Sequence, residues 1–160
     1  MIIIIAAAIY LPNIGKKPAT NFLYVTGDAV VYDYYNSGNY YYTVQNGRVE
    51  KDNYPYNPNN PKPYSPAFTE SQIYLYDAAK NLSTELSLSE AQQYQLDPGN
   101  QSPDGYVVER GSGGGGFPFG GAIQDYNSWY LKGHNRSFKL NLKLIGSYAY
   151  NNFKFLGWVK

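Results

Sequence analysis

Hydrophobic and polar side chains alternate with a period of two along most of the chain after residue 20. Short runs of this kind, rich in aromatic and β-branched residues, are typical of β-strands with one buried face. The clearest run is 137–144, in which Phe138, Leu140, Leu142 and Leu144 alternate with polar residues. This run predicts a strand whose apolar face contributes to the core.

Turn residues between the apolar runs predict how the strands are connected. Asn46-Gly47 tolerates the positive φ angles of a type I′ turn, which predicts a hairpin of residues 40–45 and 48–51. A second hairpin is expected to join 128–132 to 137–144 across a turn of residues 133–136. Further strands are expected at 21–26, 29–35, 72–77, in a segment that ends near 86, and at 106–109 and 153–159.

A helical pattern is confined to a short stretch near residues 89–95. Ser87 and Glu90, at its start, are spaced as in a capping box, in which the two side chains satisfy backbone donors at the beginning of a helix. Together with the strand runs, this stretch predicts an all-β fold of antiparallel sheets with one short helix. The sheets are expected to form either a sandwich or partial propeller-like blades.

Two unusual segments interrupt the single β-rich domain that is predicted for residues 21–160. Five prolines lie in 53–66, and because each removes a backbone donor, this segment is expected to be an exposed loop. Seven glycines lie in 111–121, which predicts a second surface loop. A phosphate-binding loop would be followed by a helix and by Lys-Ser or Lys-Thr, so no nucleotide or other cofactor is expected.

The chain begins with an uninterrupted apolar run at residues 2–11, followed by a spacer that contains Lys16 and Lys17. A membrane-spanning helix needs about 20 apolar residues, and a signal peptide carries a basic segment before its apolar run. Three interpretations therefore stay open: part of a membrane anchor, a buried element of the fold, or a degenerate signal peptide. We interpret residues 1–20 as an apolar tether and spacer of a membrane-anchored, extracytoplasmic protein, with secretion as the alternative. Lys16-Lys17 would favour a cytoplasmic flank, which conflicts with that placement.

The composition excludes several classes of site. The chain has no cysteine and one histidine, His134, which excludes a disulfide framework, a thiolate metal site and a multi-histidine cluster. Its 13 basic and 12 acidic side chains give a net charge of +1, so a nucleic-acid partner is not expected. No catalytic motif is present, and an enzyme is not expected. A hydrolase with a site formed by loops around Asp125 and His134 is the less favoured alternative.

Four short pieces of the chain follow one another as in a known repeat: IYLYD at 73–77, the turn AAKN, ELSL at 85–88 and SPDGYVV at 102–108. In this order they resemble one repeat of the WD40-like β-propeller proteins of the TolB type. The resemblance covers residues 73–108 and implies a blade-like sheet, with the Ser-Pro-Asp-Gly turn before a new strand. A closed propeller needs at least four blades of about 40 residues, so a fragment or a small sandwich is expected. The overall layout also resembles uncharacterised membrane-anchored bacterial proteins, which implies a location and no activity.

Tyrosine is the most unusual feature of the composition, with 19 of 160 residues. Strand alternation directs about half of the aromatic side chains outward, and tyrosine offers contact area at little cost in rotamer entropy. The residues predicted to form a binding face are Tyr32, Tyr34, Tyr41, Tyr74, Tyr76, Tyr148 and Trp129. Cross-strand pairs that only stabilise the sheet are the alternative explanation.

These features together predict a non-catalytic binding module at the cell envelope. Its N-terminal segment is expected to contact the membrane, and its tyrosine-rich face to bind a carbohydrate, a peptide or a protein. The alternative is a structural or assembly subunit whose apolar N-terminus packs into a partner.

Overall fold

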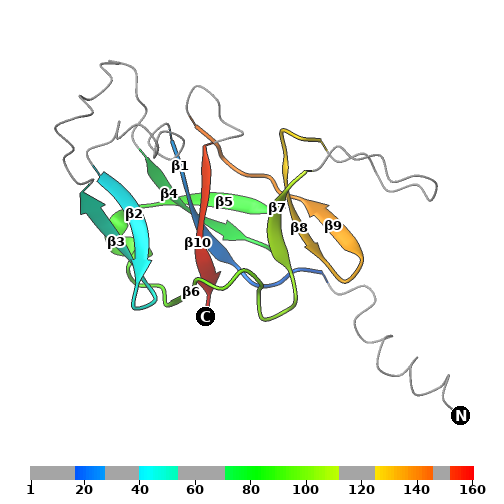
Figure 1. The fold of residues 1–160 in the computed structure, drawn as a ribbon, viewed down its shortest axis with the longest axis horizontal. Coiled ribbons are helices and arrows are strands. Elements are labelled where there is room, and N and C mark those ends of the chain that lie inside the picture. Colours follow the sequence, from blue (N-terminus) through cyan, green and yellow to red (C-terminus); the bar gives the residue numbers. More distant parts are fainter. Residues whose placement is uncertain (1–16, 28–39, 54–70, 112–124, 146–151) are drawn as a thin grey trace, which may run out of the picture.

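The computed structural model of the protein describes residues 17–27, 40–53, 71–111, 125–145 and 152–160 (Figure 1). Within these ranges the chain forms ten strands and one short helix. The strands are β1 (Phe22–Thr26), β2 (Tyr40–Gln45), β3 (Arg48–Asn53), β4 (Gln72–Asp77), β5 (Leu82–Leu86), β6 (Leu96–Asp97), β7 (Val107–Arg110), β8 (Trp129–Gly133), β9 (Arg136–Lys139) and β10 (Phe153–Val159), and the helix is α3 (Leu88–Ala91).

The strands are arranged in three sheets, and every pair is antiparallel. A five-stranded sheet has the order β5-β4-β1-β10-β6, a three-stranded sheet has the order β7-β8-β9, and β2 and β3 form a separate hairpin. This arrangement confirms the prediction of an all-β fold with antiparallel sheets and a single short helix in the described part of the chain.

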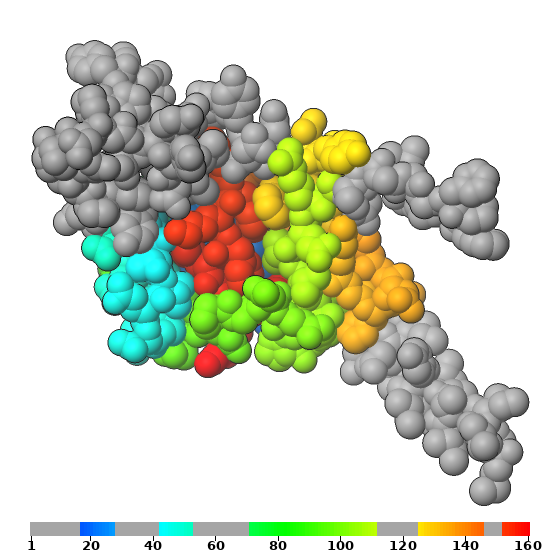
Figure 2. All heavy atoms as spheres, in the orientation of Figure 1, coloured from blue at the N-terminus to red at the C-terminus, as the bar shows by residue number. Residues whose placement is uncertain are grey.

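The central strand β1 explains how the sheets are layered. Phe22 and Tyr24 belong to a core cluster that includes side chains of the three-stranded sheet, such as Leu131. Leu23 and Val25, which point to the opposite face, belong to a second cluster with Val49 of the β2–β3 hairpin. The five-stranded sheet is therefore covered on both faces, with the hairpin on its left and the three-stranded sheet on its right in Figure 1. Figure 2 shows β10 at the surface between these two outer layers.

Both predicted hairpins are confirmed, and each is closed by two residues with positive φ. Asn46 and Gly47 have φ angles of 52° and 75°, and His134 and Asn135 have φ angles of 50° and 59°. Such pairs match the right-handed twist of the flanking strands, which is why two-residue hairpins favour them. The second strand of the later hairpin is shorter than predicted, because its ladder ends at Lys139.

Residues 140–145 continue from β9 across one face of the five-stranded sheet and are held there by side chains. The Tyr24 hydroxyl accepts a hydrogen bond from Lys143 N at 3.0 Å and donates one to Lys143 O at 3.2 Å. Asn141 N donates to Asn81 Oδ1 at 2.9 Å in the same way. Side chains of the sheet thus replace the ladder of hydrogen bonds that a neighbouring strand would supply.

Helix α3 begins earlier and is shorter than the predicted stretch near 89–95. Its predicted capping box is confirmed, since Glu90 N donates to Ser87 Oγ at 3.3 Å and Ser87 N donates to Glu90 Oε2 at 2.8 Å. The chain leaves the helix after Ala91 because Leu96 returns to the sheet edge, where its N–H donates to Gly47 O at 2.7 Å. A longer helix would not allow this return.

The residues of the propeller-like repeat are divided between two sheets. β4 and β5 belong to the five-stranded sheet, and β7 belongs to the three-stranded sheet. The Ser102–Gly105 turn forms as predicted, with Gly105 N donating to Ser102 O at 2.9 Å and a φ of 85° at Gly105. The relation to the propeller family stays a prediction.

Several predicted segments lie outside the described residues. They are the apolar run at 2–11, the strand at 29–35, and the proline-rich and glycine-rich loops apart from Asn53 and Gly111. In the part of the chain that the structure describes, no helix has the length and apolar character needed to cross a membrane.

Candidate functional site

Two of the tyrosines predicted to bind a ligand, Tyr74 and Tyr76, lie in the core. Their side chains are only 3% and 2% exposed, so the prediction that they point outward is wrong. Tyr76 stacks on Phe22 with ring centroids 4.7 Å apart, and Tyr74 stacks on Tyr24 at 5.3 Å. The face that carries them is covered by the three-stranded sheet, which removes it from contact with any ligand.

Burial also changes the acidity of these phenols. Burial raises the pKa of Tyr24 to about 12, although the hydrogen bonds that its oxygen accepts from Ser83 and from the Lys143 backbone N–H oppose this change. Burial likewise raises the pKa of Tyr76, whose hydroxyl donates to Asn81 Oδ1. These hydroxyls therefore stay protonated near neutral pH and serve the packing of the sheets.

The other predicted binding residues have different positions. Tyr32, Tyr34 and Tyr148 lie outside the described residues, and Tyr41 is the second residue of β2. Trp129 begins β8 and is half-buried, with its ring centroid 4.2 Å from that of Phe153 in the core.

The ends of the paired strands form two groups at opposite ends of the molecule. We call one of them the loop end and define it by Thr26, Gln72, Arg110, Trp129 and Phe153. Thr26 pairs with both Gln72 and Phe153, and Arg110 pairs with Trp129. The contact of the Trp129 and Phe153 rings joins the two sheets at this end.

Four internal stretches of the sequence connect described residues at the loop end, and the last of them follows Ile145, whose N–H donates to Thr26 Oγ1 at 3.1 Å. They are residues 28–39, 54–70, 112–124 and 146–151. The open end of the β2–β3 hairpin faces the same way, since its turn at Gly47 contacts Leu96 at the other end of the sheet. Three predicted binding residues, Tyr32, Tyr34 and Tyr148, thus belong to stretches that attach at the loop end.

The opposite end, which we call the junction end, is where the chain enters the domain. The Asp104 carboxylate accepts hydrogen bonds from Ala19 N at 2.7 Å, Thr20 N at 3.3 Å and Thr20 Oγ1 at 2.7 Å. Burial alone would raise the pKa of Asp104, but these bonds and one from Ser102 outweigh it and hold the pKa below its usual value. The carboxylate therefore fixes residues 19–20 to the domain.

His134 also serves the junction end. Its Nε2 lies 2.8 Å from the Asp104 carbonyl oxygen, and its ring packs edge-on against Tyr106 with centroids 5.2 Å apart. Asp125 precedes the other end of β8, a five-residue strand about 13 Å long. Asp125 and His134 therefore lie toward opposite ends of β8, and the hydrolase alternative stays a prediction.

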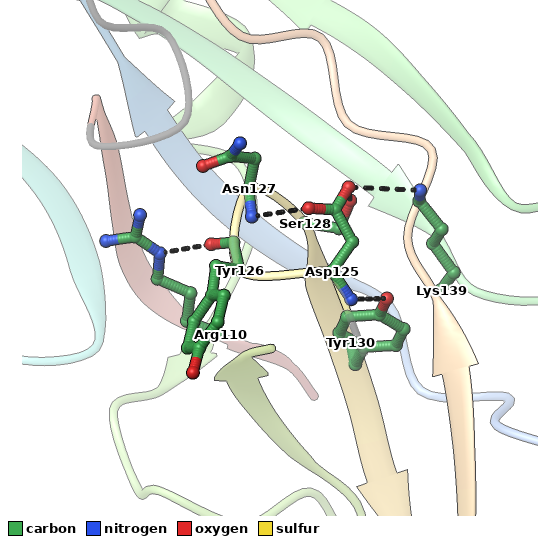
Figure 3. A network of polar contacts seen from close by, with 7 residues as sticks. All are labelled: Arg110, Asp125, Tyr126, Asn127, Ser128, Tyr130 and Lys139. Atoms are coloured by element: carbon green, nitrogen blue, oxygen red, sulfur yellow. Dashed lines mark hydrogen bonds and ion pairs between the residues drawn. The ribbon is translucent and has the colours of Figure 1, made fainter. Parts of the chain in front are cut away.

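Asp125 instead builds a braced turn at the loop end (Figure 3). Its Oδ1 accepts a hydrogen bond from Asn127 N at 2.9 Å, and its Oδ2 accepts one from Ser128 Oγ at 2.9 Å. Its backbone N–H donates to the Tyr130 hydroxyl at 3.1 Å. The bonds from Asn127 and Ser128 lower the pKa of the Asp125 carboxyl, so the brace is present at neutral pH.

This turn presents an aromatic side chain to solvent. Tyr126, the second residue of the turn, is 61% exposed, and its carbonyl oxygen accepts a hydrogen bond from Arg110 Nε at 2.6 Å. Arg110 lies on one side of the turn and Lys139, 3.8 Å from Asp125 Oδ2, on the other (Figure 3). A hydrogen-bonded turn thus holds an exposed tyrosine beside an arginine.

Tyr126 and Arg110 were not among the predicted binding residues. The sequence does hold a signal for Tyr126, because it lies between Asp125 and Asn127, two residue types that favour turns. A side chain at the tip of a turn lacks strand neighbours on both sides, so it stays exposed. The approach of Arg110 depends on the β7–β8 pairing and carries no local signal.

The chain shows no match to protein-family models, and comparisons with curated proteins and with solved structures find no match either. Over the described ranges, no group of three or more His, Asp and Glu side chains could hold a metal ion. The exposed Tyr126 beside Arg110 makes the loop end the candidate site, with Tyr126, Arg110 and Trp129 as its described side chains.

Proposed function

We propose that the chain is a non-catalytic binding module at the cell envelope, with its N-terminal segment in the membrane and its loop end directed at a ligand. The observation that carries this proposal is the placement of the two ends. The chain enters at residues 17–21, beside the Phe22–Trp158 pair, whereas the loop end is defined by the opposite ends of the same strands.

The junction end supports a fixed presentation of the domain. Three hydrogen bonds join the Asp104 carboxylate to Ala19 and Thr20, and Pro18 is buried. An anchor that continues from this point would not swivel freely about residues 18–20. The loop end would then face away from the membrane surface.

The loop end supports binding in two ways. Long connections grouped at one end of a rigid sheet scaffold are where binding residues are most often found. Tyrosine and arginine are also the residue types that dominate binding energy at interfaces, and Tyr126 and Arg110 lie together on a braced turn. The ligand classes that suit such a surface are a carbohydrate, a peptide or a protein of the envelope.

Paired variants at the two ends test this proposal. The full chain is placed in liposomes and mixed with purified envelope polysaccharide or with solubilised envelope proteins, and its retention is measured. Because an anchoring tyrosine contributes about 2 kcal/mol or more, Tyr126→Ser should weaken retention at least about tenfold, and Arg110→Ser should also weaken it. Arg136→Ser is the matched control at the junction end and should bind like the unaltered chain.

Two outcomes would contradict the proposal. One is equal retention of the loop-end variants and the unaltered chain, and the other is an equal loss in Arg136→Ser. The membrane part is tested separately by flotation. The full chain should float with the liposomes, and a chain that begins at Lys17 should not.

A further inference from the structure

The outer edge of β5 has no paired strand among the described residues. There, β5 is the last strand of the five-stranded sheet and pairs on one side only, with β4. Thr84 and Glu85 are exposed, and Leu82 is 51% exposed, an unusual fraction for a large apolar side chain within a sheet. The outer side of such a strand carries backbone N–H and C=O groups that can pair with another strand.

Other sheet edges of the molecule carry features that discourage pairing. β6, at the opposite end of the same sheet, has two residues, and Leu96 N of this strand donates to Gly47 O at 2.7 Å. β9, at the edge of the three-stranded sheet, begins with Arg136 and ends with Lys139. β5 has the sequence LSTEL, with no lysine, arginine or proline. Charged residues and prolines are the usual protection of an edge, so β5 lacks much of it.

We propose that β5 pairs with β5 of a second copy of this chain, antiparallel and about a twofold axis at Thr84. The two five-stranded sheets would then form one continuous sheet. In this register Leu82 lies opposite Leu86 of the other copy, Ser83 lies opposite Glu85, and Thr84 lies opposite itself. No like charges face each other, which is the condition for a stable cross-strand pair.

The exposed apolar side chain fits this register. Within β5, Leu82, Thr84 and Leu86 alternate with Ser83 and Glu85, so the two leucines share a face of the sheet. Leu86 packs against the second core cluster, which lies on that face. Pairing would place the exposed Leu82 of each copy against Leu86 of the other and remove it from water.

The contact is small, because β5 has five residues. Stable interfaces bury about 1,200–2,000 Å² in total, and a single pair of short strands buries less. We therefore expect a reversible dimer with a dissociation constant on the order of 0.1 mM. A tether that confines many copies to one membrane would raise their local concentration, but the pairing itself does not rest on the proposed binding function.

Cysteine cross-linking tests the axis directly, since the chain has no cysteine of its own. Directly opposite residues of antiparallel strands have Cβ atoms about 4.5–5.5 Å apart, close to the range of a disulfide. Both variants are prepared as the full chain, dispersed in detergent and oxidised mildly. An intermolecular disulfide should form at least about tenfold faster in the Thr84→Cys variant than in the Gln93→Cys variant. Gln93 is exposed just after α3 and is the control for random encounters.

Charge exchange at the same position gives a second, independent readout. Thr84→Lys and Thr84→Glu each place like charges across the axis and should lower the association measured by sedimentation of the full chain. A mixture of the two variants should restore association through Lys–Glu pairs, whereas Gln93→Lys should leave the association of the unaltered chain intact. Circular dichroism of each variant checks that its fold is kept.

Each outcome decides the proposal. Faster cross-linking of Thr84→Cys together with restored association in the mixture would establish the pairing. Cross-linking no faster than in Gln93→Cys, an unaltered chain that stays monomeric up to about 1 mM, or a mixture that fails to associate would overturn it.

Discussion

Tyr24→Phe removes one oxygen atom from the centre of the fold and should lower the free energy of unfolding by about 2 kcal/mol. The Tyr24 side chain is fully buried, and its hydroxyl accepts from Lys143 N and donates to Lys143 O. Each hydrogen bond contributes about 0.5–1.5 kcal/mol, and leaving a buried partner unsatisfied costs about 1–3 kcal/mol. Phenylalanine is easier to bury than tyrosine, which offsets part of the loss.

The assay is urea unfolding followed by tryptophan fluorescence, with Tyr74→Phe as the matched control. The Tyr74 hydroxyl donates to the Gln72 side chain at 2.8 Å, and water can replace that partner when the hydroxyl is removed. We expect a loss of about 0.5 kcal/mol for Tyr74→Phe. Faster amide exchange at Lys143 should accompany the larger loss. Equal losses in the two variants would refute the view that Tyr24 holds residues 140–145 on the sheet.

Three further perturbations follow from the same contacts. Asp104→Asn should destabilise the domain by about 1 kcal/mol at neutral pH, a solvent-screened value. Because the pKa of Asp104 is lowered in the folded state, its carboxylate stabilises the fold above the pKa of the unfolded carboxyl, and this stabilisation is lost as the pH falls. The stabilities of the unaltered chain and of Asp104→Asn should therefore converge at acid pH. The raised pKa of Tyr24 acts oppositely, so stability should fall between pH 10 and about pH 12, and in ultraviolet absorbance this phenol should titrate above the usual pKa of tyrosine. Gly133→Ala would place its Cβ 2.5 Å from Gly105 O and should lower the midpoint of thermal unfolding by several degrees, with a loss of about 1–3 kcal/mol.

The sequence predicted those parts of the fold that depend on neighbouring residues. Asn46-Gly47 closes its hairpin because both residues adopt positive φ, which their chemistry permits without tertiary help. Ser87 and Glu90 cap their helix for a similarly local reason. The end of that helix was placed too late, because the return of Leu96 to the sheet edge involves a partner far along the chain.

The orientation of the tyrosines could not be predicted from alternation alone. Alternation tells which side chains share a face, but it does not tell whether a second sheet covers that face. Tyr74 and Tyr76 lie on the face that the three-stranded sheet covers. Asp104 shows the same limit: its turn was predicted, whereas its bonds to Thr20, 84 residues away, depend on the assembled fold.

The loop end was only partly foreseen for the same physical reason. Trp129 was predicted as a binding residue, and the structure places it at the start of β8, half-buried beside Phe153. Arg110 reaches Tyr126 across 16 residues because β7 pairs with β8. A contact of this kind exists only after the strands have paired.

Hydrogen–deuterium exchange of the liposome-held chain, with and without the envelope fraction that retains it, tests the central claim most directly. Bound ligand should slow exchange at residues 110 and 125–130 of the loop end, and leave residues 133–136 of the junction end unchanged. Protection at residues 133–136 with none at 125–130 would contradict the account, as would the absence of any fraction that retains the chain.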